Sequence, residues 1–228
     1  MKYIFFSEQC PLFGRHFFQF SMFYGQRHSL QVHLSYSISM KRVQNKQYAQ
    51  GGETMFIRKA EAKDAQAFID FCARLDQETK FMLYEPGERS LTPEDQARRF
   101  ASLHESKDSI MLLAVTDQGD IAGFAAGIGS SLKRSRHAVS VVIGILQHYT
   151  GQGLGSRLLE QVENWAAANG KHRLQLTVMT HNERAIHLYT KRGFRIEGTL
   201  SHSLRVDDQF VDEYMMAKLI HTGEDSSD

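Results

Sequence analysis

Residues 143–156 read IGILQHYTGQGLGS and form the most informative stretch of the chain. An apolar run ends there in a cluster of glycines, and from Leu154 onward apolar residues recur at helical spacing. A strand that passes through a glycine turn into a helix places the first N–H groups of that helix, and the positive end of its dipole, at the turn. Because glycines let these N–H groups approach a ligand closely, the turn predicts a site for a phosphate or pyrophosphate group.

Other phosphate motifs, and a turn without a ligand, compete with this interpretation. The dinucleotide fingerprint puts a small residue where Ser156 stands and belongs after the first strand of a βαβ unit, and neither condition is met well. A P-loop requires Gly-Lys-Ser or Gly-Lys-Thr, but Gly170-Lys171 is followed by His172. A helix can also begin in a glycine-rich turn and bind nothing. The rest of the sequence is needed to choose between a phosphate-binding turn and a turn without a ligand.

Composition indicates one globular domain whose partners are small molecules or modest protein surfaces. The 228 residues are 42% hydrophobic and 23% charged, enough for one sizeable core and short for two. The net charge of +1 gives no electrostatic footprint of a nucleic-acid or membrane-surface protein. Cys10 and Cys72 are too few for a disulfide framework, which favours a reducing compartment and the cytoplasm. No apolar run approaches the roughly 20 residues of a membrane span, so we expect neither signal peptide nor anchor.

The first 54 residues differ from the rest of the chain. They are crowded with Phe, Tyr, His, Ser and Gln but show neither helical nor strand periodicity. Residues 51–55, GGETM, can be encoded as a ribosome-binding site, a spacer and a start codon, so we expect translation to begin at Met55 and residues 1–54 to be non-native or disordered. The alternative is a genuine but irregular extension. We expect one domain at 55–220 and a polar tail at 221–228.

Strand-like and helical segments alternate through the rest of the chain. Apolar runs at 109–115 and 121–128 flank the turn signal DQGD at 117–120 and predict an antiparallel hairpin. Thr92 and Pro93 supply a cap and a first-turn proline for a helix, after a loop at 81–89 that could form the rim of a pocket. The other segments are predicted strands at 56–60, 139–146, 174–179, 194–205 and 210–219, and predicted helices at 63–77, 154–169 and 182–191.

A second motif follows the glycine turn, NERAIHLY at 182–189 with Gly193-Phe194 after it. Together with QGLG at 152–155 it resembles the GNAT superfamily of N-acetyltransferases, and the similarity covers about residues 56–220. The resemblance implies a single α/β domain with a mixed, mostly antiparallel sheet of about seven strands flanked by about four helices.

The resemblance also implies acetyl-CoA as co-substrate. Residues 143–145 would pair through their backbone with the pantetheine arm, as an added strand does, and the glycine turn would hold the pyrophosphate. The cofactor-binding residues expected on this basis are Ile143, Gly144, Ile145, Gly151, Gln152, Gly153, Leu154, Gly155, Ser156 and Asn182. One position departs from the family, since its members usually have Arg or Gln where Thr150 stands.

By the same resemblance Tyr189 is the expected catalytic acid for the departing thiolate, although an arbitrary tyrosine in a helix more often packs into a core. The base stays open, because related N-terminal alanine acetyltransferases have Glu where Thr177 stands. The candidates are Glu85, Glu88, His137, His181, Asp212 and Glu213. His181 and His187 lie six positions apart and do not share a helix face as metal ligands four apart would, so no metal site is expected.

The sequence therefore predicts a transferase that moves an acetyl group from acetyl-CoA to a primary amine of a small molecule or a protein N-terminus. A non-catalytic acyl-CoA sensor and the transfer of a longer acyl group are the alternatives. Neither nucleic acid nor membrane is expected as a partner. The closing strands leave a sheet edge on which a homodimer could form.

Overall fold

The structure is a computed structural model that describes residues 46–50 and 53–220. Most of the predicted N-terminal extension and the tail at 221–228 lie outside these residues. The strands are β1 (Lys46–Gln50), β2 (Glu53–Lys59), β3 (Ile110–Thr116), β4 (Ile121–Gly129), β5 (Ala138–Ile145), β6 (Arg173–Met179), β7 (Arg195–Val206) and β8 (Gln209–Leu219). The helices are α1 (Ala65–Glu78), α2 (Pro93–Glu105), α3 (Leu154–Ala168) and α4 (Glu183–Lys191), with 3-10 turns η1 (Ala62–Asp64) and η2 (Gln147–Tyr149).

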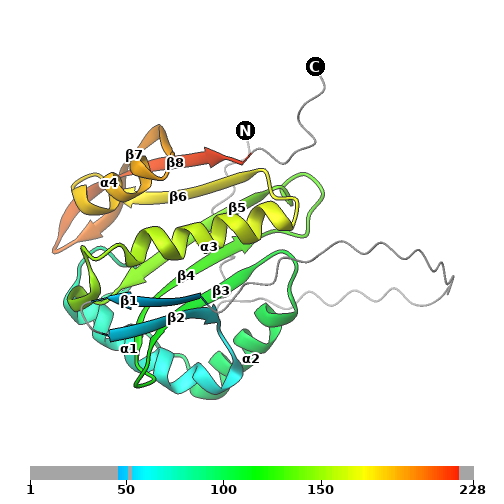
Figure 1. The fold of residues 1–228 in the computed structure, drawn as a ribbon. Coiled ribbons are helices and arrows are strands. Elements are labelled where there is room, and N and C mark those ends of the chain that lie inside the picture. The colour runs from blue at the N-terminus through cyan, green and yellow to red at the C-terminus, as the bar shows by residue number, and fades with distance from the viewer. Residues whose placement is uncertain (1–45, 51–52, 221–228) are drawn as a thin grey trace, which may run out of the picture.

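These strands form one sheet in the order β1-β2-β3-β4-β5-β6-β8-β7 (Figure 1). All neighbouring strands are antiparallel except β5 and β6, which are parallel. The predicted α/β class, a mixed and mostly antiparallel sheet flanked by four helices, is confirmed. The described part of the chain contains one strand more than the seven expected. The additional strand β1 lies before Met55, and the predicted start at Met55 stays a prediction.

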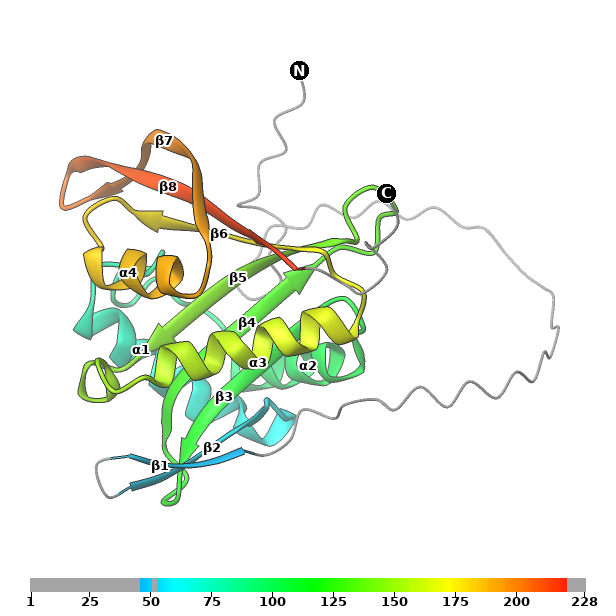
Figure 2. The same cartoon turned by 45° about the horizontal axis from the view of Figure 1, so that its top comes forward.

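Helices cover the sheet from both sides, α1 and α2 on one face and α3 and α4 on the other (Figures 1 and 2). The side chains of β3 alternate between the two cores that result. Leu112 and Ala114 belong to the core beneath α3, and Met111 and Leu113 belong to the core beneath α1 and α2. A strand buried on both faces is continuously apolar, which explains why residues 109–115 show no polar alternation.

The sheet opens between its two parallel strands. Towards β4, β5 is paired along Val139–Ile145, but towards β6 it is paired only through Ala138, Val139 and Ser140. Beyond Ser140 the two strands diverge, so the second half of β5 has one edge that no strand in the described part of the chain covers. This opening is the feature of the fold that positions the site.

Most predicted elements are confirmed within a residue or two of their bounds. The hairpin is β3 and β4, and Thr92 caps α2 by accepting a hydrogen bond from the Asp95 N–H at 3.1 Å. The helix expected at 63–77 begins as the 3-10 turn η1 and becomes α1 at Ala65. Among the residues described, no helix is long and apolar enough to cross a membrane.

Candidate functional site

The open edge of β5 presents backbone groups from alternate residues. The N–H of Leu146 donates to the carbonyl of Ala122, at the start of β4, at 3.1 Å. Since backbone groups point to opposite edges at successive residues of a strand, the N–H and C=O groups of Ile143 and Ile145 point away from β4 and into the opening. Two of the predicted pantetheine-binding residues therefore offer the ladder that an added strand would need.

Gly144 fixes β5 against the helix on its other side. A Cβ at Gly144 would lie 2.5 Å from Cε1 of Phe124 and 2.7 Å from Cδ2 of Leu75, a residue of α1. No side chain fits there without moving the core. Gly144 thus brings β5 close to α1. Its predicted role in cofactor binding stays a prediction.

The turn after β5 has the geometry expected for an anion site. Gly151 and Gly153 have φ angles of +75° and +84°, and a Cβ at either position would meet nothing within 4 Å. The N–H of Arg157 is the first to bond within the helix, to the carbonyl of Gly153 at 3.2 Å. The N–H groups of Leu154, Gly155 and Ser156 precede this bond and so have no carbonyl one turn earlier to accept from them.

α4 lies directly against the start of α3. A Cβ at Gly155 would come within 2.8 Å of Cδ2 of Leu188, so a glycine at this position permits the close packing of the two helices. Asn182 caps α4, since its Oδ1 accepts a hydrogen bond from the N–H of Ala185 at 3.2 Å. The cap uses only the amide oxygen of Asn182, so the predicted contact with pantetheine would use its NH2 group.

Tyr189 is 7% exposed and belongs to the core against which Ile143 and Ile145 pack. Its ring lies 5.8 Å from that of Phe194. Burial raises the pKa of Tyr189 well above the ordinary tyrosine value, so the hydroxyl keeps its proton at neutral pH. The packing of Tyr189 agrees both with a core aromatic and with a proton donor beside the open strand.

Glu78, which sequence reasoning missed, ties α1 to the glycine turn. Its carboxylate accepts the N–H of Gln147 at 2.7 Å and Nε of Arg74 at 2.9 Å. Burial alone would raise the pKa of Glu78, but these two hydrogen bonds hold it below its usual value. The signal in the sequence was a carboxylate in the last turn of a helix, where the helix dipole disfavours it.

A second missed residue reaches the turn from α4. Nη1 of Arg184 donates to Oγ1 of Thr150 at 2.6 Å, and that hydroxyl donates to the carbonyl of Gln147 at 2.8 Å. Gln152 also folds back, its Nε2 donating to the carbonyl of His148 at 2.8 Å. The turn is thus held by its own side chains and by neighbours from two helices.

The loop between α1 and α2 is anchored beside this site. Arg89 forms two hydrogen bonds with the buried Asp76 of α1, at 2.5 and 2.9 Å, and its guanidinium lies 4.4 Å from the centre of the Tyr84 ring. Asp76 follows Leu75 directly, the residue that meets Gly144. The predicted rim loop is therefore fixed to the same helix that supports β5.

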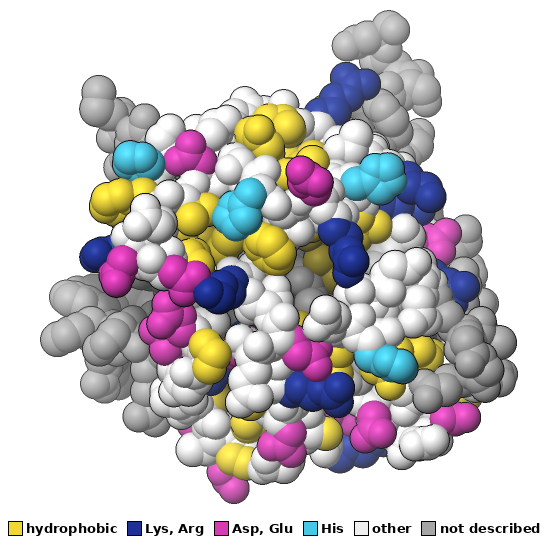
Figure 3. All heavy atoms as spheres, turned by 90° about the vertical axis from the view of Figure 1, so that its left-hand side faces the viewer, with side chains coloured by type: hydrophobic (Ala, Val, Ile, Leu, Met, Phe, Trp, Pro, Cys, Tyr) yellow, Lys and Arg dark blue, Asp and Glu magenta, His cyan; other side chains and the backbone are white. Residues whose placement is uncertain are grey.

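The same loop reaches the far half of the sheet. Lys80 pairs with Asp207 in the turn between β7 and β8, and the ring of Phe81 lies 5.3 Å from that of His181. Figure 3 shows this end of the molecule, where the surface is hollowed near its centre and mixed hydrophobic, basic and acidic side chains surround the hollow. We expect the acceptor to approach here.

The candidate bases lie in different parts of the structure. His137 lies at the end of β5 that is joined to β6, where its carbonyl accepts the N–H groups of His172 and Arg173, and it is seven residues, roughly 23 Å along the strand, from Gly144. Glu85 and Glu88 are exposed and close a turn with each other, the Glu85 N–H donating to Oε2 of Glu88 at 2.8 Å. Asp212 accepts the N–H of His202 within the β7–β8 hairpin at 2.8 Å.

Glu213 has the most informative position among them. It pairs in register with Met179, the last residue of β6, while Thr177 pairs with Met215. Because side chains alternate along strands, Glu213 lies on the same sheet face as Thr177, one strand away. A carboxylate is thus present next to the position where the related alanine acetyltransferases carry theirs.

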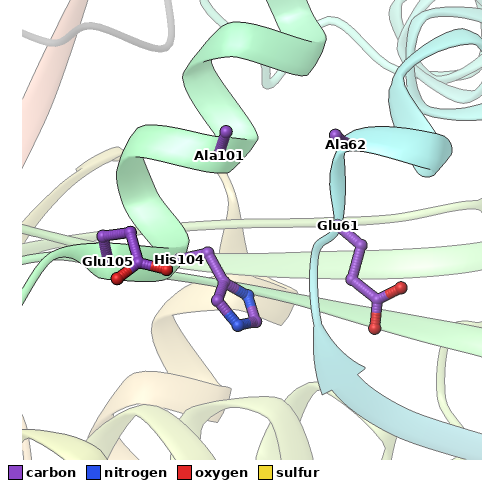
Figure 4. A pocket seen from close by; sticks show the side chains of 5 residues that line it. All are labelled: Glu61, Ala62, Ala101, His104 and Glu105. Atoms are coloured by element: carbon purple, nitrogen blue, oxygen red, sulfur yellow. The ribbon is translucent and has the colours of Figure 1, made fainter.

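A separate shallow pocket lies elsewhere, between η1 and α2. Its lining comprises Glu61, Ala62, Ala101, His104 and Glu105 (Figure 4). None of these residues belongs to the glycine turn or to β5. Within residues 46–50 and 53–220, no three His, Cys, Asp or Glu side chains come together as a metal site requires.

A profile of the acetyltransferase (GNAT) family matches residues 70–194, more than half of the chain. The chain belongs to this family. A solved structure of a GNAT-family acetyltransferase from Streptococcus pneumoniae is 40% identical with a TM-score of 0.70, and the match covers 73% of this chain and 99% of that one. The L-amino acid N-acetyltransferase AaaT of Escherichia coli (strain K12) is 29% identical over 117 residues, which are 50% of this chain and 70% of the relative.

The structure of yncA, a putative acetyltransferase from Salmonella typhimurium with its cofactor acetyl-CoA, has a TM-score of 0.64 at 19% identity, over 76% of this chain and 99% of that chain, and shows the shared fold alone. Matches to three further curated relatives span 49–63% of those proteins' own lengths. The predicted class of N-acetyltransferase is confirmed by this family membership, and the predicted co-substrate acetyl-CoA is the cofactor named for the yncA structure. These GNAT relatives lend no support to a non-catalytic sensor.

Proposed function

We propose that this GNAT enzyme transfers the acetyl group of acetyl-CoA to the primary amine of a small molecule or a peptide N-terminus. The observation that carries the proposal is the uncovered edge of β5 leading directly into the glycine turn. An extended pantetheine arm would pair with Ile143 and Ile145, and the pyrophosphate would lie at the N–H groups of Leu154, Gly155 and Ser156. The open space around Gly151 and Gly153 supports this fit.

Acetyl-CoA supplies the acetyl group as a thioester. A backbone N–H of β5 at or near Ile145 would polarise the thioester carbonyl, a role for which a rigid donor that needs no reorganisation is well suited. The C–N bond forms as a neutral amine attacks and the C–S bond breaks. One proton must then leave the nitrogen and one must reach the sulfur.

Tyr189 is proposed as the donor to the departing sulfur. The pKa of Tyr189 lies above that of a thiol, which is about 8.5, so its hydroxyl stabilises the thiolate mainly as a hydrogen-bond donor. The hydroxyl passes its proton to the sulfur as it takes up another proton in its place. This behaviour matters as charge develops on sulfur and not before, so it affects turnover rather than cofactor affinity.

Glu213 is proposed as the base that takes the amine proton, directly or through one water. Its place beside Thr177 supports this choice over the other acidic residues. We expect Glu213→Gln to lower kcat about tenfold or more and to leave the KM for acetyl-CoA unchanged. An unchanged kcat would remove Glu213 from the reaction.

The acceptor is proposed to be a small amine such as an amino acid, in line with the named activity of AaaT. The decisive experiment is thiol release from acetyl-CoA by the full chain against amino acids, polyamines, aminoglycosides and peptide N-termini. Amine-dependent release identifies the acceptor class. Tight CoA binding without release for any amine would contradict the proposed acceptors. A homodimer across the exposed β7 edge and a location in the cytoplasm stay predictions.

A further inference from the structure

The glycine turn of this chain contains no cation of its own. Residues 143–156 include neither Lys nor Arg, Arg157 follows in the first turn of α3, and Thr150 stands where the family usually carries Arg or Gln. Backbone N–H groups can cradle phosphate oxygens, but they supply only partial charges. A ligand with a pyrophosphate and a further phosphate brings several negative charges to this place.

The structure brings a cation to the turn from another element. Arg184, in the first turn of α4, lies 34 residues beyond Thr150 in sequence and bonds its hydroxyl at 2.6 Å. The hydroxyl also donates to Gln147, so the threonine is fixed and orients the guanidinium. Thr150 takes one of the five N–H donors of Arg184, and a planar guanidinium can bond two oxygens of one phosphate with others.

We propose that Arg184 binds the pyrophosphate of CoA from α4 and provides the charge that the turn lacks. The inference rests on the proposed cofactor site. It also explains Thr150, whose hydroxyl accepts a hydrogen bond from Arg184 and so holds the guanidinium beside Gly151. It also links α4, which carries Tyr189, to the occupied turn through one side chain.

The test compares three probes on the full chain, namely CoA, 3′-dephospho-CoA and pantetheine, which has no phosphate. We expect Arg184→Gln to weaken CoA and dephospho-CoA by the same factor, about tenfold, and to leave pantetheine unchanged. Lys191→Gln, at the other end of the same helix, is the matched control and should change none of the three. An unchanged thermal midpoint in Arg184→Gln shows that the fold is intact.

A second variant tests whether charge position is what matters. Adding Thr150→Arg to Arg184→Gln places the guanidinium in the turn itself, and we expect it to restore most of the lost CoA affinity. A loss for CoA alone would assign Arg184 to the 3′-phosphate and overturn the proposal, as would an equal loss for pantetheine. If the unaltered chain binds no CoA, the proposed cofactor site fails; if it binds CoA and Arg184→Gln binds equally, this inference alone fails.

Discussion

On the cofactor side of the site, most of the proposed contacts come from the backbone of one continuous stretch, residues 143–156, and the side chains of Asn182 and Arg184 add to them from the start of α4. On the acceptor side, side chains of segments far apart in sequence pair with one another, such as Lys80 with Asp207, which are 127 residues apart. Backbone groups present the same chemistry whatever the side chain, so the backbone contacts of the cofactor side need only glycines and a strand end. The acceptor side depends on particular side chains and can change with the acceptor.

The largest effect is expected from a change that breaks the cofactor side outright. Gly153→Glu puts a carboxylate at the helix start where phosphates would bind, and it should abolish CoA binding, measured by calorimetry. Gly170→Glu is the matched control, because Gly170 also has a positive φ and open space but follows the other end of α3. Equal CoA affinity in the Gly153 variant would mean that the turn does not hold the cofactor.

Tyr189→Phe should separate catalysis from binding. We expect kcat to fall about 100-fold while the CoA dissociation constant stays within twofold, since only the hydroxyl is removed. Because burial raises the pKa of Tyr189, the normal enzyme should not lose activity through ionisation of this group as the pH rises to 9. Full turnover in the variant would make Tyr189 a core residue and nothing more.

A smaller effect is expected at the support of the turn. Glu78→Gln weakens the bond to the Gln147 N–H and should raise the KM for acetyl-CoA about fivefold with little change in kcat. Arg74→Gln is the comparison, because Arg74 touches Glu78 but not the turn. If both variants behave alike, the Glu78 contact with Gln147 has no part in placing the cofactor.

The smallest effect tests the acceptor side. Lys80→Ala removes an exposed ion pair whose side chains are 70% and 65% accessible, so the KM for the amine should change about twofold or less. The KM for acetyl-CoA should not change at all. A larger effect on acetyl-CoA than on the amine would show that the two sides of the site are not separate.

The sequence predicted the strand, the glycine turn and the helix of the proposed cofactor side because their signals are local. Glycines in a strand-to-helix turn, the Thr92 cap and the DQGD turn each act within a few residues, and the structure has them in the expected places. The fold class followed from the same signals together with the family resemblance.

The contacts of Arg184 and Glu213 were beyond the sequence because they depend on register and packing between distant elements, and for Glu78 the sequence offered only its unfavourable place in the last turn of a helix. Nothing near Arg184 indicates that its side chain meets Thr150, and nothing near Glu213 gives its pairing with Met179. Strand β1 was missed for another reason, since its segment carries no clear alternation and gains its place by pairing with β2.

Only three residue pairs join β5 to β6, so the two halves of the sheet meet along a short seam. In the proposed complex the pantetheine arm fills the gap beyond that seam. The backbone groups on the open edge of β5 then have hydrogen-bond partners only while acetyl-CoA or CoA is bound. The departing product then removes a structural member of the enzyme. Each catalytic cycle would begin and end with this edge of β5 unpaired, and acetyl-CoA, which pairs with it, is also the substrate that is consumed.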